Sequence, residues 1–236
     1  MNTQTHDHIV KSYDAEIKRL VGEITRMGEL AVAQIEAAMD ALAKRDSRAA
    51  QRVADNDDAL DALEREIGHD VLRLLALRQP IARDLREILA ALRIASDIER
   101  IGDYAANVAK RSMTLNLSAP VRLASGLTAL ATLACDMVRE VLHAYNQRDA
   151  ELAHVIWQRD DELDTLYTGL FRELLTYMME DARSITACTH LLFIAKNLER
   201  IGDHATNIAE DVWFVVRGET LKEARASHLP DAPQRS

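Results

Sequence analysis

The 236-residue sequence contains few of the residues that interrupt or avoid helices. It has four prolines and eight glycines, and no proline lies between Met1 and Gln79 or between Val121 and Leu229. Aromatic residues make up only 4% of the chain, which disfavours a strand-rich sandwich or barrel. Because proline breaks helices and Ala and Leu favour them, long helices are expected over most of the sequence.

Long apolar runs and functional cysteine spacings are also missing. No run approaches the roughly 18 residues of a membrane span, and the start Met-Asn-Thr-Gln-Thr lacks the basic and apolar regions of a signal peptide. Cys135 and Cys188 fit no metal or redox spacing, so we interpret them as buried thiols. We therefore expect a cytoplasmic protein.

Negative charge exceeds positive charge. The chain has 29 Lys and Arg against 38 Asp and Glu, a net charge of -9. Such a surplus repels nucleic acid and anionic membranes, so we expect no nucleic-acid partner. Hydrophobic residues make up 48% of the chain, which is enough to build a sizeable core and excludes disorder as the main state.

Apolar residues recur at helical spacing almost throughout, as in the series Ile88, Leu92, Ala95, Ile98 and Ile101. This periodicity predicts an all-α fold. Helix breaks are predicted at residues 44–47, 78–80, 116–120, 147–149 and 180–184, so that six helices result.

Several residues resemble helix-end signals. Asp84 with Glu87 has the spacing of a capping box after Pro80, and Ser184 is a candidate N-cap. Gly218 is predicted to end the sixth helix. The chain from about residue 219, with two prolines, is predicted to form a loosely held tail.

An internal repeat divides the chain into two units. LRIASDIERIGDYAANVA (92–109) and LFIAKNLERIGDHATNIA (192–209) share eleven of eighteen residues at an offset of 100. Upstream, DDALD (57–61) aligns with DDELD (160–164) at an offset of 103. The sequence therefore predicts two tandem three-helix bundles, residues 1–117 and 118–236.

Each unit carries two acidic pairs spaced four residues apart. These pairs are Asp57 with Asp61 and Glu99 with Asp103 in the first unit, and Asp160 with Asp164 and Glu199 with Asp203 in the second. Four residues make about 400° of helical turn, so each pair lies on one helix face. The same rows begin with apolar residues, for example Ala91 and Ala95, which places the carboxylates at the rim of the bundle.

The two pairs of each unit are also expected at one height. In a helical hairpin, residues equidistant from the turn face each other. The midpoint between Asp61 and Glu99 is Pro80, inside a predicted turn. In the second unit the corresponding midpoint falls between Asp181 and Ala182, again inside a predicted turn.

Four neighbouring carboxylates repel one another, at roughly 0.2 to 0.5 kcal/mol per helical pair. A bound cation would offset this cost, and oxygen ligands suit hard divalent or trivalent ions such as Mg²⁺, Ca²⁺, Mn²⁺ or iron, with Zn²⁺ also considered. Asn107 and Asn207 continue the rows by one turn and would add carbonyl ligands or hydrogen bonds. The alternative is a solvated acidic stripe balanced by Arg65, Arg100 and Arg200.

Gly102 and Gly202 lie in the middle of predicted helices, where glycine costs about 1 kcal/mol relative to alanine. A close approach between helices beside the acids would explain both positions.

Glu66-x-x-His69 and Glu151-x-x-His154 match the i, i+3 pattern of ferritin-like metal oxidases. Their offset of 85 does not follow the repeat, so this alternative is disfavoured. The sequence also lacks a Gly-rich phosphate loop and the GxSxG and HExxH motifs.

The repeated ERIGD(Y/H)AxNxA segments, the D-D-x-L-D segments, the LRLLALRQP turn and the LLTYMMEDARSI stretch resemble the PhoU family. The resemblance extends from about Ser12 to Glu219. It implies two similar three-helix bundles and an E(D)xxxD metal motif, which all eight acidic residues above match.

The resemblance further implies a regulatory rather than catalytic role. Such proteins are cytoplasmic, often homodimeric, and restrain the phosphate-starvation response. They are thought to connect the phosphate ABC transporter to a two-component sensor histidine kinase. Two other classes stay open: an accessory protein of a different phosphate permease, and a metal enzyme.

Overall fold

A computed structural model describes residues 3–78, 80, 82–118 and 125–221, with side chains throughout except at 3–14, 57, 78 and 125. Within these ranges the chain forms helices and no strand, which confirms the predicted all-α class. The elements are α1 (Thr3–Lys44), α2 (Ser47–Asp55), α3 (Asp57–Arg78), α4 (Arg83–Asn116), α5 (Ser125–Gln147), α6 (Ala150–Gln158), α7 (Asp160–Glu180), the short 3-10 helix η1 (Ala182–Ser184) and α8 (Ile185–Arg217).

Two of the six predicted helices are each interrupted at a single residue. Asn56 separates α2 from α3, and Arg159 separates α6 from α7, at equivalent places of the repeat. Consequently α3 begins at Asp57 and α7 at Asp160, so these acids lie in the first turn of a helix rather than in its middle. Carboxylates are stabilised there by the unpaired N–H groups and the helix dipole.

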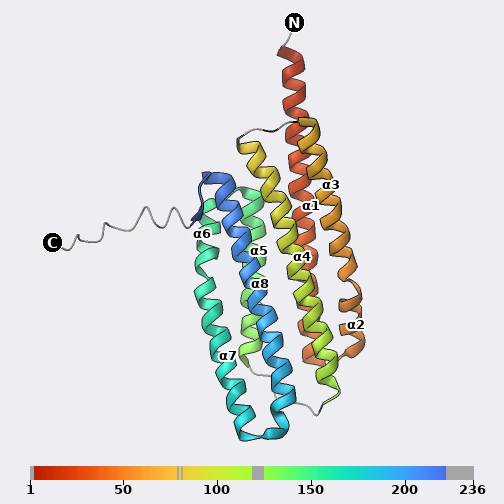
Figure 1. Cartoon of the computed structure of the whole chain (residues 1–236), viewed down its shortest axis with the longest axis vertical. Coiled ribbons are helices and arrows are strands. Elements are labelled where there is room, and N and C mark those ends of the chain that lie inside the picture. The colour runs from red at the N-terminus through yellow and green to blue at the C-terminus, as the bar shows by residue number, and fades with distance from the viewer. Residues whose placement is uncertain (1–2, 79, 81, 119–124, 222–236) are drawn as a thin grey trace, which may run out of the picture.

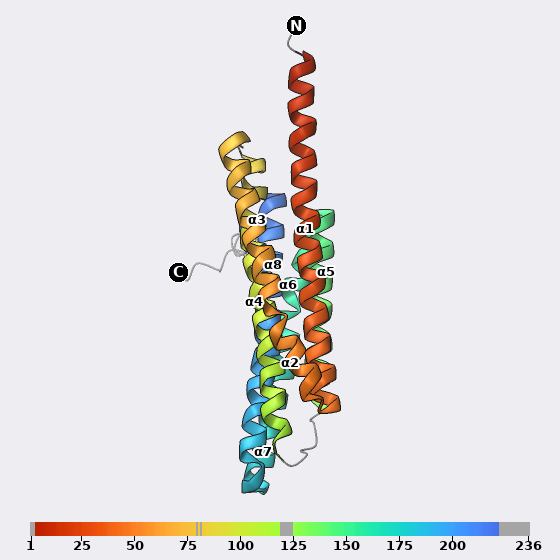
Figure 2. The same ribbon diagram turned by 90° about the vertical axis from the view of Figure 1, so that its right-hand side faces the viewer.

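The helices form two sets of three, one per repeat unit (Figures 1 and 2). The first set is α1, α2–α3 and α4, and the second is α5, α6–α7 and α8. The central helices α4 and α8 pack against each other in opposite directions, and α1 contacts α5. The α3–α4 and α7–α8 turns therefore lie at opposite ends of the molecule (Figure 1). This arrangement agrees with two tandem bundles.

The predicted boundary and tail fall largely on undescribed parts of the chain. Helix α4 ends at Asn116 and α5 begins at Ser125, while residues 119–124 lie outside the described residues. Residues 222–236 of the predicted loose tail also lie outside them. Leu221, the last described residue, is only 3% exposed, so the start of this segment is packed.

Of the three predicted helix-end signals, one is confirmed, one is confirmed in position only, and one is wrong. Gly218 adopts a left-handed conformation with φ of 80° and ends α8, because glycine has no Cβ to hinder it. Ser184 occupies the N-cap position of α8, but its hydroxyl donates to the carbonyl oxygens of Tyr177 and Asp181 and makes no capping bond to α8. Helix α4 begins after Ala82 without a side-chain cap, so Asp84 does not form the predicted capping box with Glu87.

The two mid-helix glycines permit the close approach that the sequence predicts. A Cβ added at Gly102 would overlap Leu60 Cδ1, and one added at Gly202 would overlap Leu163 Cδ2. Leu60 and Leu163 occupy equivalent positions of the repeat and are buried. These contacts hold α3 against α4 and α7 against α8.

Replacing Gly202 by Ala is expected to lower the free energy of unfolding by up to about 2 kcal/mol. Alanine gains about 1 kcal/mol of helix propensity, but forcing a methyl group into a packed contact costs about 1 to 3 kcal/mol. Gly169→Ala is the matched control, since a Cβ at that helical position meets nothing within 4 Å. Urea unfolding should place Gly169→Ala above wild type and Gly202→Ala below it, and the reverse order would contradict the packing role.

Candidate metal centres

Each acidic group combines the first two turns of one helix with the middle of the next. We call Asp57, Asp61, Glu99 and Asp103 the first acidic group, and Asp160, Asp164, Glu199 and Asp203 the second acidic group. The first lies on α3 and α4, and the second lies on α7 and α8. The leucine–glycine contacts described above bring these helices together beside the carboxylates.

The described members of the first acidic group lie close enough to repel one another. Burial raises the pKa of Glu99, and the charges of Asp103, Asp61 and Glu64 raise it further against the opposing charge of Arg100. The predicted common height of Asp61, Glu99 and Asp103 is consistent with this coupling. The side chain of Asp57 lies outside the described residues.

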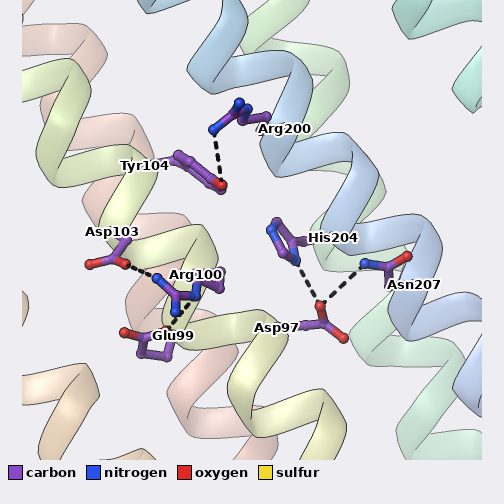
Figure 3. A network of polar contacts seen from close by, with 8 residues as sticks. All are labelled: Asp97, Glu99, Arg100, Asp103, Tyr104, Arg200, His204 and Asn207. Carbon is purple, nitrogen blue, oxygen red and sulfur yellow. Dashed lines mark hydrogen bonds and ion pairs between the residues drawn. The ribbon is translucent and has the colours of Figure 1, made fainter.

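Of the arginines predicted to balance the acidic groups, Arg100 contacts carboxylates of the first acidic group. Arg100 Nη1 donates to Asp103 Oδ2 at 3.0 Å, and its Nε lies 3.5 Å from Glu99 Oε2 (Figure 3). Arg65 Nε instead donates to the backbone carbonyl oxygen of Asp61. Arg200 Nη1 donates to the Tyr104 hydroxyl on α4 (Figure 3).

All four members of the second acidic group influence one another. Burial, then the charges of Glu199, Asp160 and Asp164, raise the pKa of Asp203 to about 6. Burial and the charges of Asp164, Asp161 and Glu199 raise the pKa of Asp160. These charge influences between α7 and α8 are consistent with the common height that the hairpin midpoints predict.

The donor chemistry of both groups fits a hard metal ion. Every member offers carboxylate oxygen, and Asp160 Oδ1 is buried without a hydrogen-bond partner. In the described side-chain arrangement, however, no three His, Cys, Asp or Glu residues converge on one point. Arg100 and Lys196 engage Glu99, Asp103 and Glu199, so these cations would have to give way to a metal. Metal ligation therefore stays a prediction.

Asn107 and Asn207 are exposed, and Asn207 has an additional role. Across the α4–α8 contact, its Nδ2 donates to Asp97 Oδ1 at 3.4 Å (Figure 3). Only its carbonyl oxygen remains for the predicted role beside the acidic row.

A polar network between the two units escaped the sequence analysis. His204 Nδ1 lies 2.7 Å from Asp97 Oδ1, the rings of Tyr104 and His204 meet at 5.6 Å, and Arg200 donates to the Tyr104 hydroxyl at 3.5 Å (Figure 3). The signal was present as differences within the repeat, where Asp97 aligns with Asn197 and Tyr104 with His204. The network links α4 to α8 near their midpoints.

Two further acidic residues are buried away from the predicted groups. Asp211 on α8 is 8% exposed and lies 3.3 Å from Arg93 Nε, and burial raises its pKa to about 7 despite that arginine. Glu87 on α4 pairs with Arg148, and burial again raises its pKa. Both cysteines are buried as predicted, and burial raises the pKa of Cys135 to about 11.

Comparison with known proteins identifies the relatives of this chain. The PhoU domain family model matches residues 24–112 and 127–212. A phosphate-specific transport system accessory protein PhoU homolog of Xylella fastidiosa (strain 9a5c) is 61% identical over 225 residues, 95% of each chain. The homolog of Rhizobium meliloti (strain 1021) is 50% identical over 215 residues, 91% of each chain. The crystal structure of PhoU from Pseudomonas aeruginosa has a TM-score of 0.84 at 40% identity, covering 88% of this chain and 100% of that one.

The fold and the repeated acidic groups define a duplicated helical-bundle protein with two PhoU domains. The chain belongs to the PhoU family, as its sequence motifs predict. Over the part of the chain that the structure describes, no helix has both the length and the apolarity needed to cross a bilayer.

Proposed function

We propose that this chain is a cytoplasmic, non-enzymatic accessory protein of phosphate transport that restrains phosphate uptake and the phosphate-starvation response when phosphate is plentiful. The observation that carries the proposal is similarity over 95% of both chains to a phosphate-specific transport system accessory protein. A second crystal structure, of the phosphate transport system regulatory protein PhoU from Streptococcus pneumoniae, has a TM-score of 0.83 at 30% identity, covering 89% of this chain and 99% of that one. The likeness spans both units, so the whole bundle is shared.

The proposed mechanism is that of an adaptor between the phosphate ABC transporter and a two-component sensor histidine kinase. Large exposed apolar side chains near the two turns support such a role, because they offer contact area for partners or for a homodimer. Near the α3–α4 turn these include Leu72 and Leu77, and near the α7–α8 turn Leu175 and Met179. Two separate ends are suited to two partners.

The two acidic groups are proposed to hold divalent or trivalent ions within this adaptor. A bound ion would supply positive charge that relieves carboxylate repulsion and ties α3 to α4 and α7 to α8. The carboxylates of this chain would contribute the ligands, and the packed glycine contacts hold α3 against α4 and α7 against α8 beside them. The ferritin-like alternative gains no support, since Glu151 pairs with Arg217 and His154 contacts the rings of Trp157 and Trp213.

Deleting the gene is expected to raise expression of the phosphate-starvation regulon in phosphate-rich medium, because the restraint on the kinase is lost. Reporter activity of a regulon promoter, measured at high and low phosphate, tests this. Complementation with the wild-type gene is the control. Unchanged expression in the deletion strain would contradict the regulatory role, and altered uptake through a different permease alone would favour the accessory alternative.

A further inference from the structure

The second acidic group contains a lysine that the first acidic group lacks. Lys196 lies one turn before Glu199 on α8, and its Nζ lies 2.5 Å from each of the two carboxylate oxygens of Glu199. Glu199 is only 7% exposed, so solvent screens this ion pair weakly. The ammonium therefore neutralises a carboxylate that is proposed to bind metal.

Lys196 is held at this position by more than one residue. Its Nζ lies 5.4 Å from the ring centroid of Tyr167 on α7, within cation–π range. The lysine ammonium is thus held between α7 and α8 by groups from both helices.

The equivalent positions of the first unit have different chemistry. Ser96 aligns with Lys196 at the offset of 100, and Glu64 aligns with Tyr167 at the offset of 103. The negative charge of Glu64 acts on Glu99, so the first group gains a carboxylate where the second has an aromatic ring. The first group therefore has more negative charge and no ammonium at these positions.

Arg100, the cation that pairs with the first acidic group, is held less tightly than Lys196. The Arg100 side chain is 58% exposed, and its contacts of 3.0 and 3.5 Å are longer than those of Lys196. The Lys196 side chain is 40% exposed and its partner Glu199 9%, against 58% for Arg100 and 22% for Glu99, so displacing Lys196 leaves the more buried carboxylate without its cation. The two groups therefore present different barriers to an incoming ion.

We propose that Lys196 is a built-in competitor for metal at the second acidic group, so that the chain binds metal more tightly at the first group than at the second. This inference rests on the metal binding in the proposed function. The expected affinity ratio is about tenfold or more, since a metal must displace Lys196 from the buried carboxylate of Glu199. One family motif present twice would then give two sites that fill at different metal concentrations.

Calorimetric titration of the full, metal-free chain with Mn²⁺ tests the proposal. Wild type should show a tighter and a weaker class of site, and the double substitution Glu99→Gln with Asp103→Asn should remove the tighter class. In that background, Lys196→Ser should tighten the remaining site by about tenfold or more. Lys196→Met repeats the test while keeping the apolar stem, in case the serine variant folds poorly. Conversely, Ser96→Lys should weaken the tighter site.

Lys44→Ser is the matched control, because Lys44 also pairs with a carboxylate on its own helix but lies outside both groups. It should leave both affinities unchanged. Equal affinity at the two groups, or Lys196 variants that bind Mn²⁺ as wild type does, would overturn the inference while metal binding itself stands. Absence of any Mn²⁺ binding would overturn both the inference and the metal part of the proposed function.

Discussion

Adding Mn²⁺ to the metal-free protein is expected to raise its melting temperature, because an ion that binds only the folded carboxylate groups stabilises the fold. At 100 times the dissociation constant, free ion adds about 2.7 kcal/mol per site by mass action. For a chain of this size that corresponds to roughly 5 to 10 °C. Circular dichroism melts with Mg²⁺, Mn²⁺, Fe²⁺ or Zn²⁺ after chelator treatment measure the gain and rank the ions.

The double substitution Glu99→Gln with Asp103→Asn is expected to abolish the gain that comes from the first acidic group. Without metal this variant should melt no lower than wild type, since it relieves like-charge repulsion and removes only exposed pairs with Arg100. Asp40→Asn, which removes an exposed carboxylate on α1, is the control and should respond to metal as wild type does. Wild-type melting that is unchanged by all four ions would identify the acids as a solvated or partner-binding surface. An undiminished response in the double variant would place the metal elsewhere.

Replacing Asp211 by Asn is expected to stabilise the protein at pH 7.5 by roughly 2 to 4 kcal/mol. Burial raises the pKa of Asp211 from its ordinary 3.8 to about 7, with Arg93 opposing and Asp97 and Glu210 adding to the shift. The folded protein therefore holds this proton more tightly than the unfolded chain does. The stabilisation from Asp211 is fully present below about pH 4 and is lost as the pH rises to about 7.

Urea unfolding at pH 4.5 and pH 7.5 tests the sign of this effect. Asparagine resembles the neutral carboxyl group at both pH values, so the variant should match wild type more closely at pH 4.5 and exceed it at pH 7.5. Asp136→Asn, at an exposed carboxylate, should show no such dependence. A difference between Asp211→Asn and wild type that does not change with pH would mean that Asp211 is ionised in the fold throughout.

Much of this architecture follows from patterns that act locally or repeat. Helical periodicity fixes the secondary structure, and the offsets of 100 and 103 relate the two units without any tertiary information. The cost of glycine inside a helix correctly indicates the contacts of Gly102 with Leu60 and of Gly202 with Leu163. Hairpin geometry likewise predicts, from sequence positions alone, that the carboxylates of each acidic group lie at a common height.

Other features depend on three-dimensional choices that no short pattern encodes. The breaks at Asn56 and Arg159 involve neither proline nor glycine, so no helix-breaking residue indicates that α3 and α7 begin at acidic residues. Lys196 could equally have extended into solvent from α8, and only packing against Tyr167 and Glu199 determines its position. The environment of Asp211 on α8 likewise depends on Arg93 of α4, a helix that is far away in the sequence but packs against α8.

Tyr104 and His204 occupy the same place in the two repeats, and their rings meet where α4 crosses α8 (Figure 3). A residue that touches its own counterpart lies beside the axis that relates the two halves. In a dimer of identical chains such a residue must face itself, so a histidine there would oppose a second histidine and, when protonated, a like charge. Covalent fusion of the halves removes that constraint. His204 pairs with Asp97 while Tyr104 and Asn197 take the equivalent places of the other half, so this contact is made once instead of twice.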